Sequence, residues 1–404
     1  MPATPPVGEP APTDGALPEA ALAELRDPRR PFGVYVHVPY CAHRCGYCDF
    51  NTYVDTDGSA LRFVDDAIAE LRLAAGVLGA DRPPARTVFV GGGTPTLLPA
   101  ADLTRLLQGV RDEIGLAPDA EVTTEANPES VDDRYLAELR AGGFTRLSFG
   151  MQSARTHVLA VLERRHTPGR PEQCVAWARA AGFEQVSLDL IYGTPGESAD
   201  DWRASLHAAL GAEPDHVSAY GLTVEAGTRL AAQVARRELA PPDDDVLADR
   251  YEVADDVLSS AGMSWYEISN WARGEAARCR HNIGYWSNDS WWGIGPGAHS
   301  HVGGVRWWNV RLPSEHAAAV RAGRSPAQAR EVLDDEQQRV ERVLLGVRLA
   351  DGHPVDDLLT AGRAAAKRYA DDGLLDPAAL AAGRLRLTLR GRLLADVVVR
   401  DLVD

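Results

Sequence analysis

The sequence predicts an α/β fold, in which a parallel barrel of six strand–helix units, short of the full eight, precedes a smaller α+β domain. Two observations predict it. From Phe32 onward, short apolar runs alternate with longer amphipathic segments, which is the pattern of βαβ units. The chain has 404 residues, of which 45% are hydrophobic and 25% charged, enough for two or three domains with a sizeable core. An open, doubly wound sheet is the structural alternative.

Six apolar runs are expected to form the parallel strands: Val34–Val38, Thr87–Val90, Glu121–Glu125, Arg146–Phe149, Gln185–Leu190 and His216–Gly221. The segments between them have helical periodicity: Ala60–Leu78, Ala101–Ile114, Val131–Ala141, Pro171–Ala181 and Asp200–Leu210. In a barrel and in an open sheet alike, functional side chains gather where parallel strands end. Residues 32–245 are therefore expected to carry the main site.

The rest of the chain divides by composition. Residues 1–31 hold eight of the 26 prolines and are expected to be a disordered tail with one short helix, Pro18–Arg26. Residues 246–315 are dense in Trp, Gly, His and Asn. Residues 316–404 contain an amphipathic helix, Glu336–Leu349, then helical stretches near Val355–Thr360 and Arg363–Ala370, and an expected strand pair, Arg384–Leu389 and Leu393–Val399, turned by Gly391. This order resembles a winged-helix module.

The overall charge and the cysteine count restrict the partners and the cellular compartment that the sequence predicts. A net charge of −16 repels phosphate backbones, so nucleic acid is not an expected partner and the last domain is expected to serve packing. We find no secretory signal pattern and no apolar run near the ~20 residues that span a bilayer. Three of five cysteines crowd within eight residues, which favours a metal site in a reducing, cytoplasmic setting over disulfides.

The central motif is Cys41-x3-Cys45-x2-Cys48, directly after the first expected strand. Thiolates suit iron–sulfur clusters or zinc. A structural zinc site takes four ligands, and only three cysteines are local. Three thiolates on a four-iron cluster leave one iron open to a small molecule. Zinc with His37 or His43 as fourth ligand is the alternative.

This motif, with Tyr47 before its third cysteine, resembles the radical S-adenosylmethionine (SAM) superfamily. The resemblance implies a [4Fe–4S] cluster on Cys41, Cys45 and Cys48, whose open iron binds SAM. One electron from the cluster then cleaves SAM to methionine and a 5′-deoxyadenosyl radical. The glycine-rich segment GGGTPT, residues 91–96, follows the second strand and is expected to contact the methionyl end of SAM.

Further stretches, FGMQS (149–153), DLIYGTPGE (189–197) and HVSAYGLTVE (216–225), resemble the HemN-like, oxygen-independent coproporphyrinogen III dehydrogenase family. By matching motifs, the first SAM is expected to touch Tyr35, Tyr47, Gly92, Glu125 and Thr223. Positions that bind a second SAM in the dehydrogenase match Gly93, Thr94, Gln152, Arg164 and Asp189.

Two features separate the chain from the dehydrogenase within that family. Phe50 occupies the position of a fourth cysteine, and the dehydrogenase's longer N-terminal segment is replaced by the Pro/Ala tail. Residues 246–315 then match a HemN-like extension in which His281-Asn282-x2-Tyr285-Trp286 resembles the heme chaperone (HemW) group. The resemblance makes His281 the candidate heme ligand, with Cys279, His299 and His301 as rivals, whereas a packed core histidine is the structural alternative.

The resemblance therefore implies a heme chaperone without classical turnover, and the alternative is a dehydrogenase that decarboxylates coproporphyrinogen III. The expected cofactors are the [4Fe–4S] cluster, SAM and heme. The expected partners are heme or a porphyrin, a heme-acceptor protein and an electron donor. Peripheral membrane contact, and either a monomer or a homodimer, are compatible with the sequence.

Overall fold

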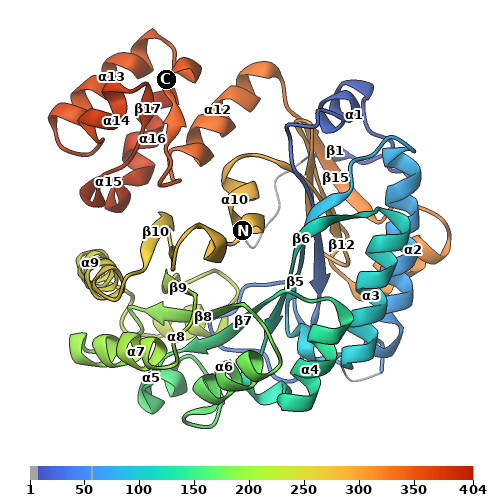
Figure 1. The fold of residues 1–404 in the computed structure, drawn as a ribbon, viewed down its shortest axis with the longest axis horizontal. Helices are drawn as coiled ribbons and strands as arrows, with labels where there is room; N and C mark the ends of the chain where they lie inside the picture. The colour runs from blue at the N-terminus through green and yellow to red at the C-terminus, as the bar shows by residue number, and fades with distance from the viewer. Residues whose placement is uncertain (1–7, 56–57, 404) are drawn as a thin grey trace.

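A curved, mostly parallel sheet forms the centre of the molecule, which a computed structural model describes for residues 8–55 and 58–403 (Figure 1). Six strands pair in parallel and in chain order: β2 (Phe32–Val38), β5 (Ala85–Gly92), β6 (Leu116–Ala126), β7 (Arg146–Gln152), β8 (Gln185–Tyr192) and β9 (His216–Gly221). The helices between them lie outside the sheet: α2 (Ala60–Leu78), α3 (Ala100–Glu113), α4 (Asp133–Gly142), α5 (Thr156–Val161), α6 (Arg170–Ala180) and α7 (Ala199–Gly211). The predicted α/β class and the six strand–helix units are confirmed.

Alternation along each strand separates the core from the interior of the barrel. On β5, Val88 and Val90 are each 1% exposed and belong to the same core as Leu103 of α3. Phe89 lies between them and lines the interior cavity instead. Because successive side chains of a strand point to opposite faces, each strand supplies one row to the helices and one row to the interior.

The sheet continues beyond both ends of the six-strand unit. β12 (Ser290–Ile294) pairs in parallel with β2, and three antiparallel strands follow it outward: β13 (His299–Val302), β14 (Val305–Asn309) and β15 (Ala327–Val332). At the other edge, β11 (Asn270–Ala272) pairs with β9, and β10 (Ser264–Glu267) pairs with β11. The segment rich in Trp, Gly and His thus supplies strands to both edges of the barrel sheet.

Helix α10 (Arg280–Trp286) connects those two edges. It lies between β11 and β12 in the chain, and its first turn hydrogen-bonds to Glu121, near the start of the β6 pairing with β5. The ring of His281 on α10 bonds to Thr87 at the start of β5. Helix α10 therefore forms the floor of the barrel, at the end where the parallel strands begin.

The disorder expected for residues 8–31 is wrong, whereas the short helix expected over Pro18–Arg26 is confirmed. Strand β1 (Glu9–Pro10) pairs with β15, and α1 (Glu19–Leu25) places Ala21 and Leu25 in the main core at 1% and 2% exposure. The high proline content of this segment led to the prediction of disorder. An edge strand tolerates a proline because one side of the strand is unpaired. Residues 1–7 lie outside the described part of the chain.

The C-terminal domain is helical and has its own core. Its elements are α12 (Asp335–Gly346), β16 (His353–Pro354), the 3₁₀ turn Val355–Asp357, α13 (Thr360–Asp371), α14 (Pro377–Ala381), β17 (Arg384–Leu385), α15 (Leu389–Leu393) and α16 (Ala395–Val403). The expected strand Leu393–Val399 is wrong. Val398, Val399 and Leu402 are spaced for one face of a helix, and all three are buried in this second core. The strand was predicted because residues 397–399 are three consecutive valines, which favour strands by propensity.

The remaining α-helices of the described chain are α8 (Arg229–Ala235), α9 (Asp244–Ser260) and α11 (Pro313–Arg321). The C-terminal domain is joined to α9 by Arg392, whose guanidinium donates to both carboxylate oxygens of Asp255 at 2.9 and 2.8 Å. Among residues 8–55 and 58–403, no helix combines the length and apolar content that a membrane span requires.

Candidate functional site

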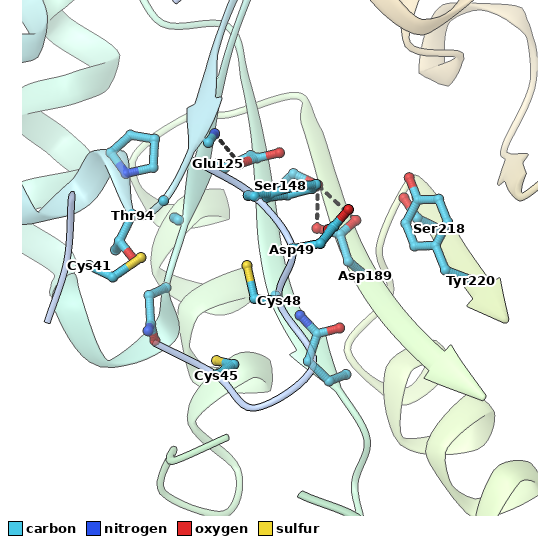
Figure 2. Close-up of a pocket in the computed structure, with 18 of the residues that line it drawn as sticks. Cys41, Cys45, Cys48, Asp49, Thr94, Glu125, Ser148, Asp189, Ser218 and Tyr220 are labelled. Carbon is cyan, nitrogen blue, oxygen red and sulfur yellow. Dashed lines mark hydrogen bonds between the residues drawn. The ribbon is translucent and has the colours of Figure 1, made fainter. Parts of the chain in front are cut away.

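The three clustered cysteines lie on one loop at the end of the barrel where the strands finish. Cys41 ends β3 (Tyr40–Cys41), which pairs with β4 (Tyr53–Val54), so the loop between them is fixed at both ends. The backbone N–H of Cys48 donates to the carbonyl of Cys45 at 3.3 Å, which turns the loop back on itself. Figure 2 shows the three sulfur atoms arranged around one open space. In the described ranges, no three His, Cys, Asp or Glu side chains converge closely enough for one metal ion.

Burial controls the ionisation of these thiols. It raises the pKa of Cys41, against a weaker opposing effect of the Thr94 hydroxyl, which donates to the sulfur at 3.7 Å. It raises the pKa of Cys48 to about 11. A protein thiol in such a setting becomes a thiolate when a metal centre binds it.

The glycine-rich segment after β5 closes against the cysteine loop. The N–H of Gly93 donates to the carbonyl of Val38 at 2.7 Å, and that of Thr94 donates to the carbonyl of Tyr40 at 2.8 Å. A Cβ on Gly93 would lie 2.5 Å from the Tyr40 oxygen and 3.0 Å from the Cys41 sulfur. Gly92 has a φ of 109°, which favours glycine. Glycine is therefore required here for close approach of the backbone to the thiols.

Two carboxylates face the same interior. Glu125 accepts the N–H of Gly92 at 3.0 Å, and burial, followed by repulsion from Asp189, raises its pKa to about 8. Burial also raises the pKa of Asp189, whose two oxygens each lie 3.0 Å from the hydroxyl of Ser148 (Figure 2). Neither carboxylate has a salt-bridge partner within the described chain, so both are set to receive hydrogen bonds or positive charge from a ligand.

The remaining expected SAM contacts surround this centre. The guanidinium of Arg164 donates to the sulfur of Cys45 at 3.8 Å and to the carbonyl of Gly150 at 2.9 Å, while its Nε is buried and has no hydrogen-bond partner among residues 8–55 and 58–403. Gln152 holds a positive φ of 65° at the end of β7. The Tyr35 hydroxyl lies 3.0 Å from Nδ1 of His37. Tyr47 packs against the small apolar cluster of Val158, Leu162, Ile191, Leu222 and Leu230, and Thr223 is exposed at the rim.

One cavity of about 1960 Å³ collects all of these residues. Its lining includes every predicted SAM contact, the three cysteines and His281. Cavities for a single small molecule usually measure about 300–1,000 Å³. The cavity is therefore large enough for more than one ligand.

His281 lies on the floor of this cavity and is 3% exposed. Both of its ring nitrogens have partners: Nδ1 lies 2.8 Å from the Thr87 hydroxyl, and Nε2 lies 2.9 Å from the Tyr285 hydroxyl. Burial lowers its pKa to about 3, so the ring is neutral. As placed, His281 must give up one of these hydrogen bonds to bind iron, and its role as a heme ligand stays a prediction.

The three rivals of His281 differ in their surroundings. Cys279 is buried on the floor and donates to Glu121. His301 has Nδ1 2.9 Å from the carbonyl of Asp289, and its Nε2 accepts the N–H of Gly304 at 3.3 Å. His299 is half-buried and lines the cavity.

Polar rows inside the barrel were not anticipated. Ser148 and Arg146 lie two residues apart on β7, and β8 and β9 contribute Ser187 and the pair His216 and Ser218 to the same lining. Arg146 is 2% exposed and its Nη2 has no hydrogen-bond partner within the described residues. Period-two spacing of polar residues within the predicted strands is the signal that identifies such rows.

Comparisons with known proteins agree with this geometry. The family model described as "Radical SAM superfamily" matches residues 35–209. The chain is 53% identical over 379 residues to the "Heme chaperone HemW" of Mycobacterium tuberculosis, an alignment that covers 93% of this chain and 96% of that protein. The chain belongs to the HemW family. The "Heme chaperone HemW" of Escherichia coli is 35% identical over 277 residues, covering 67% of this chain and 70% of that one.

This chain shares its fold with a solved structure of a radical SAM enzyme. The solved structure described as "Coproporphyrinogen III oxidase (HemN) from Escherichia coli is a Radical SAM enzyme" superposes with a TM-score of 0.81 at 24% identity, covering 96% of this chain and 94% of that one. The predicted HemN-like fold is confirmed.

Proposed function

We propose that this chain is a heme chaperone, which binds heme and transfers it to acceptor proteins from a radical SAM scaffold. The observation that carries the proposal is the identity of 53% to the "Heme chaperone HemW" of Mycobacterium tuberculosis across 93% of this chain and 96% of that protein. Phe50, in the position where the dehydrogenase has a fourth cysteine, is 49% exposed beside the cysteine loop.

The described residues fit the cluster and SAM that the superfamily implies. The donor set is three free thiols around one space, and the tight approach of Gly93 leaves no room for a side chain between backbone and sulfur. When bound, a [4Fe–4S] cluster on Cys41, Cys45 and Cys48 supplies an electron and one iron without a protein thiolate. The buried Nε of Arg164, which no other described residue accepts from, is a donor available to a ligand.

The roles of this chain's own residues follow from their positions. Glu125 accepts a hydrogen bond from the ribose or amino group of the first SAM, and Tyr35, Tyr47 and Gly92 line its site. Thr223 closes the rim. Gly93, Thr94, Gln152 and Arg164, together with Asp189, form the proposed contacts of a second SAM. The proposal includes an acceptor protein, an electron donor and a cytoplasmic setting, which suits five free thiols.

Heme titration of anaerobically reconstituted full-length protein tests the proposal. We expect a saturable shift of the Soret band, and we expect no product when coproporphyrinogen III is incubated with SAM and a reductant beside an active dehydrogenase control. An unchanged Soret band would refute the chaperone proposal. Vinyl-bearing product in the second assay would favour the dehydrogenase.

A further inference from the structure

The cavity continues past β2 to a wall that none of the proposed SAM contacts uses. This wall, which we call the β13–β14 wall, is formed by His299, Trp308, Asn309 and Arg311. These residues come from the strands that extend the sheet beyond β12 and from the loop that follows them. Since the cavity of about 1960 Å³ exceeds what one small ligand fills, the wall is available to a second, larger one.

His299 is held in a fixed position on this wall. Its carbonyl accepts the indole N–H of Trp291 at 3.0 Å, and its ring stacks on Trp308, with centroids 6.0 Å apart and an interplanar angle of 30°. Trp308 is 3% exposed and therefore backs the imidazole rigidly. A ring fixed in this way loses little further freedom when it binds a ligand.

The nitrogens of His299 are available. Among residues 8–55 and 58–403, neither ring nitrogen has a hydrogen-bond or ion-pair partner, although the ring lies inside the cavity. Burial lowers its pKa to about 4, so near neutral pH the imidazole is uncharged and keeps a lone pair for a metal. In contrast, His281 and His301 each use both nitrogens in hydrogen bonds.

Four other histidines line the cavity and fit a heme ligand less well. His216 uses both nitrogens, toward the hydroxyls of Ser187 and Tyr266. His37 uses both nitrogens, toward the Tyr35 hydroxyl and the carbonyl of Asn51. His43 lies on the cysteine loop and is exposed, so it offers no enclosed site for a heme. His166 lies beside Arg164, and neither His43 nor His166 contacts an aromatic ring within the described residues.

We propose that His299 on the β13–β14 wall is the protein's axial ligand to heme iron, which rests on the proposed heme-chaperone function. The imidazole lone pair forms the Fe–N bond, and no proton or electron has to leave the ring. Arg311 lines the same wall and brings positive charge for the heme propionates. The floor histidine, His281, then keeps α10 in place through its bonds to Thr87 and Tyr285.

Ferric heme binding to the full-length protein, followed by absorption and electron paramagnetic resonance, tests this assignment in wild type, His299→Ala, His281→Gln and His166→Ala. We expect His299→Ala to weaken binding by about tenfold or more and to change the spin state, and free imidazole to restore the wild-type spectrum. His281→Gln and His166→Ala are expected to keep the wild-type spectrum. Circular dichroism and iron loading establish that each variant is folded.

A second substitution protects the test against a folding defect. His299→Met keeps a neutral side chain and exchanges imidazole for thioether, so we expect a changed ligand signature with heme still bound. A wild-type spectrum in both His299→Ala and His299→Met, or its loss only in His281→Gln, would overturn the assignment and leave the chaperone proposal standing. Absence of heme binding by the wild type would instead refute the chaperone proposal.

Discussion

Replacement of Gly93 by alanine should abolish cluster loading without unfolding the protein. A Cβ at this position meets the backbone oxygen of Tyr40 at 2.5 Å, the Tyr40 carbonyl carbon at 2.9 Å and the sulfur of Cys41 at 3.0 Å. Ordinary contact begins near 3.4 Å, so the two segments must separate by about 0.9 Å. Because the contacted atom is backbone, a change of side-chain rotamer cannot relieve the clash.

The size of that displacement decides its effect. Overpacking of this kind costs about 1–3 kcal/mol, less than the 5–15 kcal/mol by which a typical domain is stable. Metal–ligand distances tolerate only about ±0.2 Å, and Cys41 belongs to the displaced strand β3. We therefore expect a folded Gly93→Ala variant that lacks most of its iron and sulfide.

The assay is iron and acid-labile sulfide per chain after anaerobic reconstitution, with circular dichroism to show that the variant is folded. Gly76→Ala is the matched control, because at this helical position the added Cβ has no atom within 4 Å apart from its chain neighbours and the backbone of its own helix. Alanine there should leave loading unchanged and raise stability by about 0.5–1 kcal/mol. Wild-type iron and sulfide content in Gly93→Ala would show that the close approach of backbone to sulfur is not required.

Three other outcomes are expected. Replacement of Cys41, Cys45 or Cys48 by serine should remove iron loading, as metal analysis of each variant would show. The same replacement at Cys174, which is buried away from the three clustered cysteines, should leave iron loading intact. Since burial raises the pKa of Glu125 from 4.5 to about 8, the folded state holds a proton that the unfolded state loses in this window. The free energy of unfolding should then fall between pH 4.5 and 8, less steeply in Glu125→Gln, as urea denaturation of the metal-free protein would show. Glu70→Ala should lower the free energy of unfolding by about 3 kcal/mol or more, because the buried groups that donate hydrogen bonds to Glu70 lose their acceptor. Glu138→Ala, which removes an exposed ion pair, should change the free energy of unfolding by less than about 1 kcal/mol.

The six barrel strands were predictable because their signal is local. Each is a short apolar run followed by a helical segment, and the observed bounds of β7, β8 and β9 begin at the predicted residues. The short helix α1 was predictable as well, but strand β1 was not, because it is two residues long and depends on β15, more than 300 residues away. The valines of α16 were ambiguous for another reason, because propensity favours a strand while the packed face of the domain requires a helix.

The cluster side of the site was predictable for the same reason as the strands. Its thiols lie within eight residues, and its glycines follow one strand. The interior rows were missed because an isolated Arg146 or Ser148 is unremarkable until neighbouring strands bring Asp189 and His216 beside it. His281 stood out by motif, yet its two hydrogen bonds become visible only when α10 is placed against β5.

The β13–β14 wall is the part of the site most dependent on tertiary structure, and Glu70 explains how it is held. From α2, this buried carboxylate accepts the N–H of Gly295 at 2.7 Å, the amide of Asn309 at 2.6 Å and the ring of His316 at 2.7 Å. One side chain thus joins an outer barrel helix to the turn before His299 and to the strand that carries Trp308. Because the Glu70 carboxylate fixes the position of the β13–β14 wall as well as stabilising it, Glu70→Ala should also alter the absorption spectrum of bound heme. If the wall has a purely structural role, Glu70→Ala should lower the stability of the protein and leave the heme spectrum unchanged.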